Sequence, residues 1–420
     1  MKKIIILLII TFIIVIPVFS QTMDMAESNK YRVYTDISKE IAQYAATAMD
    51  EYFKLYNRYF HFDENKLDSK LQIRIFQSKD GFDNYLSTII PGTSNSYVFL
   101  QYKNTKRSEL VTYSMDDTDK MKKTLIHHGF VQFLKTFIPQ APLWMQKGFA
   151  IYFEKSLYND QDNTVTFQEN LDWAVTLKKY IAADRKDPLN QKLFSISDLL
   201  SIDTTEANKN INVFYAESWA LVSFLINSKY SEYNRVLWDA ISSLKQDASK
   251  IENEAAIIKS SFVWTDKNTF LTDFYFYAES IKSFNELVQD GIKAYSEGNL
   301  GEAERTFIKG MIINENNYIP YYYMGLINYA RKDYAMAEYY YHSTAERGGD
   351  TNLLNYALGV NSYANNNSED AVFYLSKVES GDYYNKSIEL LTSLSDGSGE
   401  DVNSLENDSD QKETQSKSSK

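Results

Sequence analysis

The sequence of 420 residues contains no cysteine, only six prolines and only four histidines. The lack of cysteine excludes a disulfide framework, thiolate catalysis, zinc sites built from thiolates and an acylated cysteine at the N-terminus. Basic residues are outnumbered, with 44 Lys+Arg against 56 Asp+Glu, so the formal net charge is −12. Because binding to phosphates requires a basic face, this balance argues against nucleic acid as the main partner.

The first twenty residues have the pattern of a secretory signal peptide. Lys2 and Lys3 precede an apolar run over residues 4–16, and a short segment from Pro17 to Ser20 follows. The run is too short to span a bilayer, which needs about 20 residues. We therefore expect an exported protein, periplasmic or extracellular, without stable membrane insertion after cleavage. Residues 21–29 are expected to be a linker, and an uncleaved N-terminal anchor is the alternative.

The region over residues 30–116 has the pattern of a small sheet that carries one long helix. Alternating polar and apolar residues predict four short strands, at residues 31–34, 71–75, 97–100 and 110–113. Apolar residues at three- and four-residue spacing predict a helix from Asp36 to Tyr59. From residue 117 to about residue 280 the pattern is almost wholly helical, so the fold class expected for residues 30–280 is α+β.

Residues 284–394 contain an internal repeat with a period of 34 residues. Four sets of positions keep this period: Gly291, Gly325 and Gly359; Tyr295, Tyr329 and Tyr363; Ala303, Ala337 and Ala371; and Phe307, Tyr341 and Leu375. The period and the small residues resemble those of tetratricopeptide repeats, in which each repeat is a helix–turn–helix. The resemblance implies an all-α solenoid of three repeats, although the usual Trp and Pro are missing. Residues 395–420 are acidic and nearly free of large apolar residues, so we expect a disordered tail.

Two segments between residues 124 and 154 resemble the core of the peptidase-MA-like gluzincins, which are zinc metallopeptidases with a His-Glu-x-x-His helix. The first reads Thr-Leu-Ile-His-His-Gly-Phe-Val-Gln-Phe-Leu, and the second matches the family's following helix at Pro142, Trp144, Gly148, Ala150 and Tyr152. The likeness extends over about residues 30–280. It implies a gluzincin-like domain, with a sheet part over residues 30–116 and a helical part over residues 117–280.

The residues that the family uses for catalysis are missing from these segments. The best register places His128 at the first ligand position, Gly129 at the general base, Gln132 at the second ligand and Lys147 at the third. A zinc peptidase needs three ligand atoms and a carboxylate base, so this register predicts a degenerate site without metal or cofactor. A register that starts at His127 fails in the same way. Glu154 lies about 10 Å along the helix from Lys147 and does not replace the missing ligand.

Lys147 has two interpretations. In the first, its ammonium occupies the place of the metal and contacts Gln132 and the His128 ring. In the second, the side chain points to solvent.

The sequence therefore favours an exported, non-catalytic binding or scaffold protein of the cell envelope, and the alternative is a zinc metallopeptidase with an unorthodox site. A gluzincin-like cleft holds an extended peptide along an edge strand, which here is best matched by residues 96–101, with Tyr97 and Phe99 as candidate contacts. The repeats offer a second surface for a protein or peptide. Tyrosine is favoured at binding surfaces. The candidate contacts in the repeats are Tyr321, Tyr322, Tyr339 and Tyr340.

Overall fold

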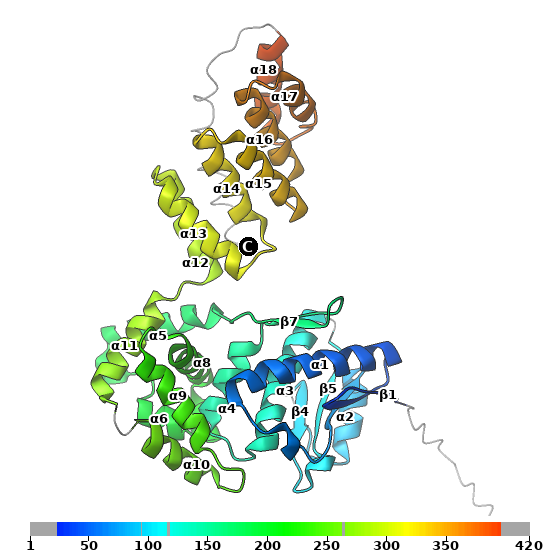
Figure 1. Cartoon of the computed structure of the whole chain (residues 1–420), viewed down its shortest axis with the longest axis vertical. Helices are drawn as coiled ribbons and strands as arrows, with labels where there is room; N and C mark the ends of the chain where they lie inside the picture. Colours follow the sequence, from blue (N-terminus) through cyan, green and yellow to red (C-terminus); the bar gives the residue numbers. More distant parts are fainter. Residues whose placement is uncertain (1–22, 94, 116–117, 263–264, 396–420) are drawn as a thin grey trace, which may run out of the picture. The chain divides into compact units, whose positions relative to one another are not determined.

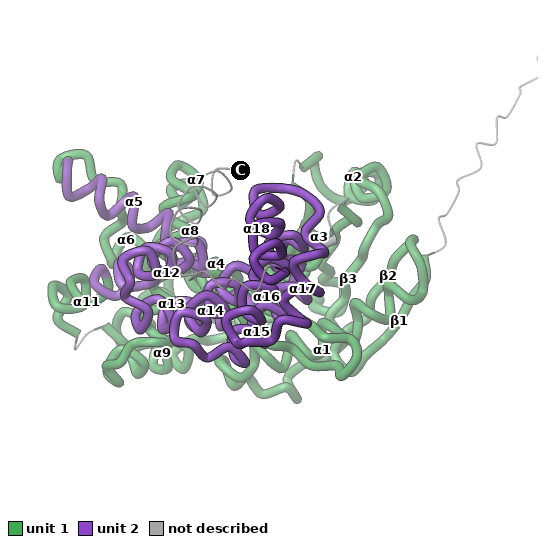
Figure 2. Tube along the Cα trace, turned by 90° about the horizontal axis from the view of Figure 1, so that it is seen from above, with its two compact units in different colours: residues 1–170, 187–274 green, residues 171–186, 275–420 purple. Residues whose placement is uncertain are grey.

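The computed structural model describes residues 23–93, 95–115, 118–262 and 265–395 (Figure 1). The expected signal peptide and, apart from Ser395, the expected disordered tail lie outside the described residues. The chain forms two compact units, which Figure 2 colours separately. The first unit extends to Asn170 and resumes over Asp187–Phe274, whereas the second contains Leu171–Lys186 and the chain from Tyr275 onward. The protein is a mixed α and β structure in which a small N-terminal sheet precedes a helical region.

The sheet of the first unit has the strand order β1-β2-β3-β5-β4. Its strands are β1 (Asp24–Glu27), β2 (Tyr31–Thr35), β3 (Leu71–Phe76), β4 (Tyr97–Leu100) and β5 (Glu109–Tyr113). The three inner strands are parallel, and both edge strands, β1 and β4, pair antiparallel with their neighbours. The four predicted strands are all present. The expected linker over residues 21–29 contains strand β1, which was missed because only one of its four residues is buried.

The long helix α1 (Lys39–Phe60) packs on the sheet and forms the centre of the core. Its N-cap Ser38 accepts a hydrogen bond from the backbone N–H of Ile41, which satisfies one of the free donors of the first turn. A short helix, α2 (Lys79–Ser87), connects β3 to β4. Phe53 and Tyr56 of α1 are fully buried against the rings of Phe133 and Phe130, which lie on the helix that follows β5, so the apolar spacing seen in the sequence is the core face.

The helices that follow the sheet complete the first unit. Helix α3 (Thr118–Phe137) crosses α1, and α4 (Leu143–Phe153) packs against α3 and against α8. The remaining elements of this unit are the hairpin β6 (Leu157–Asn159) and β7 (Thr164–Thr166), and the helices α6 (Ile196–Ser201), α7 (Thr204–Lys209), α8 (Ile211–Asn227), α9 (Ser231–Ser243), α10 (Lys250–Ile257) and the first half of α11 (Lys267–Ser280).

Helices α4 and α8 approach each other closely at Gly148. A Cβ atom at this position would lie 2.3 Å from the carbonyl oxygen of Ser218 and 2.7 Å from a methyl group of Val222. Real Cβ atoms do not approach backbone oxygen atoms at that distance, so only glycine permits this packing. Trp144 of α4 and Trp219 of α8 are fully buried beside the contact.

The second unit consists of helices. They are α5 (Asp172–Lys186), α12 (Phe284–Ser296), α13 (Leu300–Ile313), α14 (Tyr318–Ala330), α15 (Tyr334–Glu346), α16 (Thr351–Ala364), α17 (Ser368–Leu375) and α18 (Tyr384–Ser395), together with the end of α11 from Tyr275. Within this unit Lys178 of α5 forms an ion pair with Glu286 of α12. The helical region expected over residues 117–280 is therefore divided, since α5 and the end of α11 group with the repeat region.

The repeat region forms three antiparallel helix pairs, α12–α13, α14–α15 and α16–α17. The turn within each pair has the same geometry, with a left-handed residue followed by an Asn or Asp N-cap. The left-handed residues are Gly298, Lys332 and Asn366, and the N-caps are Asn299, Asp333 and Asn367. Both sets keep the period of 34 residues, so the sequence repeat corresponds to a repeated helix–turn–helix.

Close packing within each pair explains the periodic glycines. A Cβ at Gly291, Gly325 or Gly359 would meet the side chain sixteen residues later, at 2.7 Å from Phe307, 2.4 Å from Tyr341 and 2.6 Å from Leu375, respectively. The alanines of the repeat, Ala303, Ala337 and Ala371, are completely buried. The small and large positions of the repeat are therefore complementary parts of one helix–helix contact.

We expect Gly325→Ala to destabilise the repeat region by about 1–3 kcal/mol, because the new methyl group overlaps the Tyr341 ring and the helices must separate. The matched control is Gly310→Ala on α13, where the nearest atoms lie 3.6 Å away and the higher helix propensity of alanine stabilises by about 1 kcal/mol at most. Urea unfolding followed by circular dichroism measures both changes. Equal stability of the two variants would contradict the packing argument.

Candidate functional site

The candidate site of the first unit lies where β4, α3, α4 and α8 meet. Successive residues of a helix are 100° apart, so His127, His128, Val131 and Lys135 of α3 share one face. His127 is in contact with Glu154 at the end of α4, and His128 packs on Tyr97 of β4. This face of α3 therefore points toward β4 and α4.

His127 is linked to the end of α4 by a chain of hydrogen bonds. Its Nδ1 lies 2.8 Å from Oε2 of Glu154, and the side-chain amide of Asn170 donates to Oε1 of the same carboxylate. Burial lowers the pKa of His127, the bond to Glu154 raises it and the charge of Lys147 lowers it again, with a net fall. The imidazole is therefore neutral at pH 7, and its Nδ1–H donates to Glu154, which leaves Nε2 as an acceptor.

His128 stacks on the edge strand. Its ring lies parallel to the Tyr97 ring at an interplanar angle of 21°, and the His127 ring is 4.6 Å away between centroids. The residue is 8% exposed. Burial, the neighbouring His127 and the charge of Lys147 together hold the pKa of His128 well below its usual value. His128 is thus a neutral ring that fixes the α3 face to the first residue of β4.

Lys147 is half-buried on the opposite wall. Burial and the charge of Lys135 lower its pKa to about 8, against the opposing effect of Glu154. Its Nζ lies 5.7 Å from the centre of the Tyr215 ring of α8. Among the described residues it forms no hydrogen bond or ion pair, so the first interpretation, a hydrogen-bonded contact with Gln132 and His128, does not hold. The second does not hold either, because the side chain is half-buried and does not extend freely into solvent.

Two residues of the sequence register, Gly129 and Gln132, do not point toward the two histidines. A Cβ at Gly129 would lie 2.3 Å from Cε of Met49, so this position faces α1 and not the site. Gln132 is 1% exposed, and its amide donates to the carbonyl oxygen of Gln72 at 2.8 Å. A register that starts at His127 instead would use His128 and Val131, both of which lie on the face toward the site.

The residues of the site do not fit a zinc ion in either register. Nδ1 of His127 is occupied by Glu154, Val131 has no ligand atom, and the Lys147 ammonium is close enough to lower the pKa of both histidines. A cation would be repelled by this ammonium and would find two imidazoles at most. Across the described residues, no group of three or more His, Asp or Glu side chains is placed to hold a metal.

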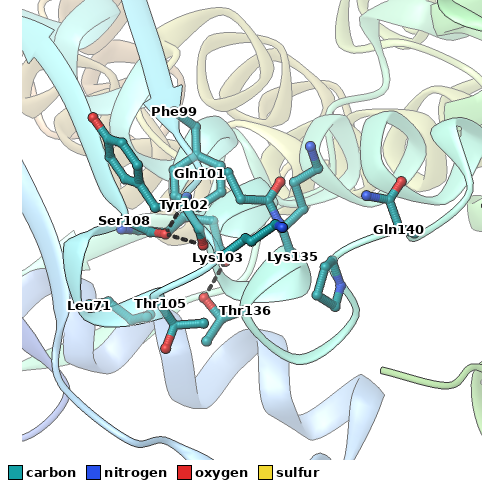
Figure 3. A pocket seen from close by; sticks show the side chains of 12 residues that line it. Leu71, Phe99, Gln101, Tyr102, Lys103, Thr105, Ser108, Lys135, Thr136 and Gln140 are labelled. Atoms are coloured by element: carbon teal, nitrogen blue, oxygen red, sulfur yellow. Dashed lines mark hydrogen bonds between the residues drawn. The ribbon is translucent and has the colours of Figure 1, made fainter. Parts of the chain in front are cut away.

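A pocket of about 370 Å³ opens beside the far end of β4, and Figure 3 shows the side chains that line it. Phe99 and Gln101 contribute from β4 and the residue after it, and Gln132 and Lys135 contribute from α3. Of the two residues of β4 that were expected to contact a ligand, Tyr97 packs on the His128 ring and Phe99 lines the pocket.

The four candidate tyrosines of the repeats lie in the second unit. Tyr321 is half-buried with the Arg347 guanidinium 3.9 Å from its ring centre, and Tyr322 packs against Tyr341. Tyr339 is 60% exposed and meets Tyr340 edge to face. Each of the four retains ring surface outside the core, most of all Tyr339.

No protein-family model matches the chain, and no curated protein resembles it significantly in sequence. None of the helices in the described ranges is both long enough and apolar enough to cross a membrane.

Sequence reasoning missed Glu154 and Asn170 as members of the site. Seven residues separate Lys147 from Glu154, which is about two helical turns and places both on one face of α4. That spacing was the available signal. It excludes Glu154 as a replacement ligand at the position of Lys147 but does not indicate the contact with His127. Asn170 follows the β6–β7 hairpin, and nothing in the sequence marks it.

We expect Glu154→Gln to lower the pKa of His127, because the carboxylate favours the charged imidazole through its hydrogen bond and its charge. Histidine ring signals followed by NMR from pH 4 to pH 8 measure the change. Glu346→Gln, at an exposed position of α15 in the second unit, is the control and should leave the titration of His127 unchanged. A higher pKa of His127 in Glu154→Gln would contradict the assigned contact.

Glu169 is a second unusual carboxyl group, next to Asn170. Its Oε2 lies 3.4 Å from the Asn227 amide, and its shielded Oε1 has no hydrogen-bond partner among the described residues. Burial raises its pKa from 4.5 to about 7. In the range between these values the folded chain keeps a proton that the unfolded chain releases, so this group makes the free energy of unfolding fall as the pH rises.

We expect Glu169→Gln to abolish this contribution. The stability of the variant relative to the natural sequence should increase between pH 4.5 and pH 7 and remain constant above that range. Urea unfolding at a series of pH values measures the difference, and Glu232→Gln on the exposed side of α9 serves as the control. A relative stability that is independent of pH would show that Glu169 is ionised throughout.

Proposed function

We propose that the protein is an exported, non-catalytic binding or scaffold protein, periplasmic or extracellular. In this proposal residues 30–280 form a gluzincin-like domain that has lost its metal chemistry, and residues 284–394 form a tetratricopeptide-like array. The observation that carries the proposal is the composition of the α3 face. It presents neutral His127 and His128 with Val131 to a lysine, where a peptidase needs metal ligands and a carboxylate base.

The ligand that we propose for the first unit is an extended peptide that adds to β4. This strand is the last in the sheet order and pairs on one side with β5, so its other side has backbone groups available for a further strand. Tyr97 is held by His128 at one end, and Phe99 lines a pocket at the other. The two contacts give such a peptide a defined path without requiring a metal.

The repeats are proposed to bind a protein partner. Tyr339 and Phe373 occupy equivalent positions of successive repeats, 34 residues apart, and are 60% and 50% exposed. Val372 on the same helix as Phe373 is 44% exposed. Exposed aromatic residues at matching repeat positions support an extended binding surface on α15 and α17.

We expect a peptide to protect the backbone amides of β4 from hydrogen exchange. The probe is an N-acetylated pentapeptide of alternating threonine and valine that ends in glutamate, added at millimolar concentration to the full chain. Mass spectrometry should show slower exchange over residues 96–101 and no change over β1, which is the opposite edge of the same sheet and the internal control. Tyr97→Ala should weaken the effect, since it removes the ring that packs on His128.

Protection of β1 alone, or of neither strand, would contradict strand addition at β4. The same samples, incubated with zinc, distinguish the binding protein from a metallopeptidase. Cleavage of the peptide that requires zinc and disappears in His127→Ala and His128→Ala would establish the alternative function.

A further inference from the structure

The pocket beside β4 differs in charge from the rest of the molecule. Although the sequence carries 56 acidic residues, none of the twelve residues that line the pocket is acidic, and two are the lysines Lys103 and Lys135. The other polar lining groups are neutral hydroxyls and amides, namely Gln101, Tyr102, Thr105, Ser108, Gln132, Thr136 and Gln140. A net positive pocket in an acidic protein favours an anionic ligand.

Lys135, the lysine of α3 that lines the pocket, has no partner of opposite charge among the described residues. Lys135 is half-buried, burial lowers its pKa, and it forms no ion pair with any described residue. The charge of Lys135 also lowers the pKa of Lys147, so the two ammonium groups lie close enough to repel each other. Desolvated ammonium groups without counter-ions are costly, and a bound carboxylate removes that cost.

Gln132 provides a second and independent indication. It is 1% exposed, lines the pocket and donates its amide N–H to the backbone of β3, yet its Oε1 accepts no hydrogen bond from any described residue. A buried amide oxygen without a donor is unusual, since almost all such groups are satisfied. A ligand that carries an N–H donor next to its carboxylate would satisfy both Gln132 and Lys135 once the Gln132 side chain turns its shielded oxygen toward the pocket.

We propose that this pocket binds a carboxylate of the peptide that adds to β4, with Lys135 and Lys103 as the cationic contacts and Oε1 of Gln132 as the acceptor of a peptide N–H. The proposal rests on the proposed function and adds the ligand's chemistry to it. Phe99, Leu71 and Pro139 supply the apolar part of the pocket and pack against the methylene groups of the ligand. The carboxylate comes from an acidic side chain or from the C-terminus, and peptide chemistry distinguishes these sources.

The test uses isothermal titration calorimetry of the full chain with four forms of the threonine–valine pentapeptide. The peptide ends in glutamate or glutamine, and each version has a free or an amidated C-terminus. We expect the amidated glutamine peptide, which has no carboxylate, to bind about tenfold more weakly than the best of the others. Preference for the amidated glutamate peptide assigns the site to a side chain, and preference for the free-acid glutamine peptide assigns it to the C-terminus.

Lys135→Gln and Lys103→Gln should each remove this preference. Lys123→Gln, an exposed lysine on the same helix, is the matched control and should keep it. Lys135→Met adds a readout that a structural lysine would not give: it should raise the Tm, because an unpaired half-buried charge is removed, while the carboxylate preference is lost. A Tm that falls in Lys135→Met would show that Lys135 has a structural partner, and would overturn the proposal.

N-acetylglutamate tests the pocket without strand addition. We expect it to bind with a Kd of about 1–10 mM, in keeping with its size, and to lose binding in Lys135→Gln. If it binds but no peptide does, the pocket stands and strand addition at β4 fails. If all four peptides bind equally, strand addition stands and the carboxylate pocket is wrong. If neither N-acetylglutamate nor any peptide binds, both proposals are overturned.

Discussion

The close contact between α3 and α1 at Gly129 sets the orientation on which the site depends. Any side chain at this position would displace Met49, and the Tyr56 hydroxyl of α1 donates to the carbonyl oxygen of Ile126 at 2.8 Å, one turn away. With that side of α3 fixed against α1, the opposite side must face β4 and α4. These contacts place His127, His128, Val131 and Lys135 on the side that faces β4 and α4, where His127 meets Glu154 and His128 meets Tyr97.

Charge is distributed unevenly around this face. In the described part of the chain, Glu154 is the one carboxylate that contacts His127 or His128, and His127 and Asn170 hold its two oxygens. Because both histidines are neutral, Lys147 and Lys135 are left as the main cations of the cleft. Both lysines are half-buried, so solvent reaches them only in part.

The arrangement of the elements could be predicted from the sequence, because alternation and helical spacing are local properties. The helix pairs of the repeat region could be predicted from the 34-residue period, since Gly325 and Tyr341 are two parts of one contact and recur together. Strand β1 and helix α2 were missed because both are short and bury few residues. The orientation of α3 could not be predicted from periodicity, as this helix is covered on several sides. Glycine at position 129 indicates close approach but not the partner, and the sequence register placed it in the site instead of against α1.

The same limit explains why the site's hydrogen bonds escaped sequence reasoning. His127 and Glu154 are 27 residues apart, and their contact depends on the angle between α3 and α4, which the close approach of Gly148 to α8 fixes from the other side. A sequence motif relates positions along one helix. The geometry of this site depends instead on two helices, each held by a close contact at a glycine, Gly129 on α3 and Gly148 on α4. Those contacts position backbone and not ligand atoms, so they persist whatever side chains occupy the face between them. A frame held together by backbone contacts does not depend on metal ligands, which is the physical basis of the binding function that we propose.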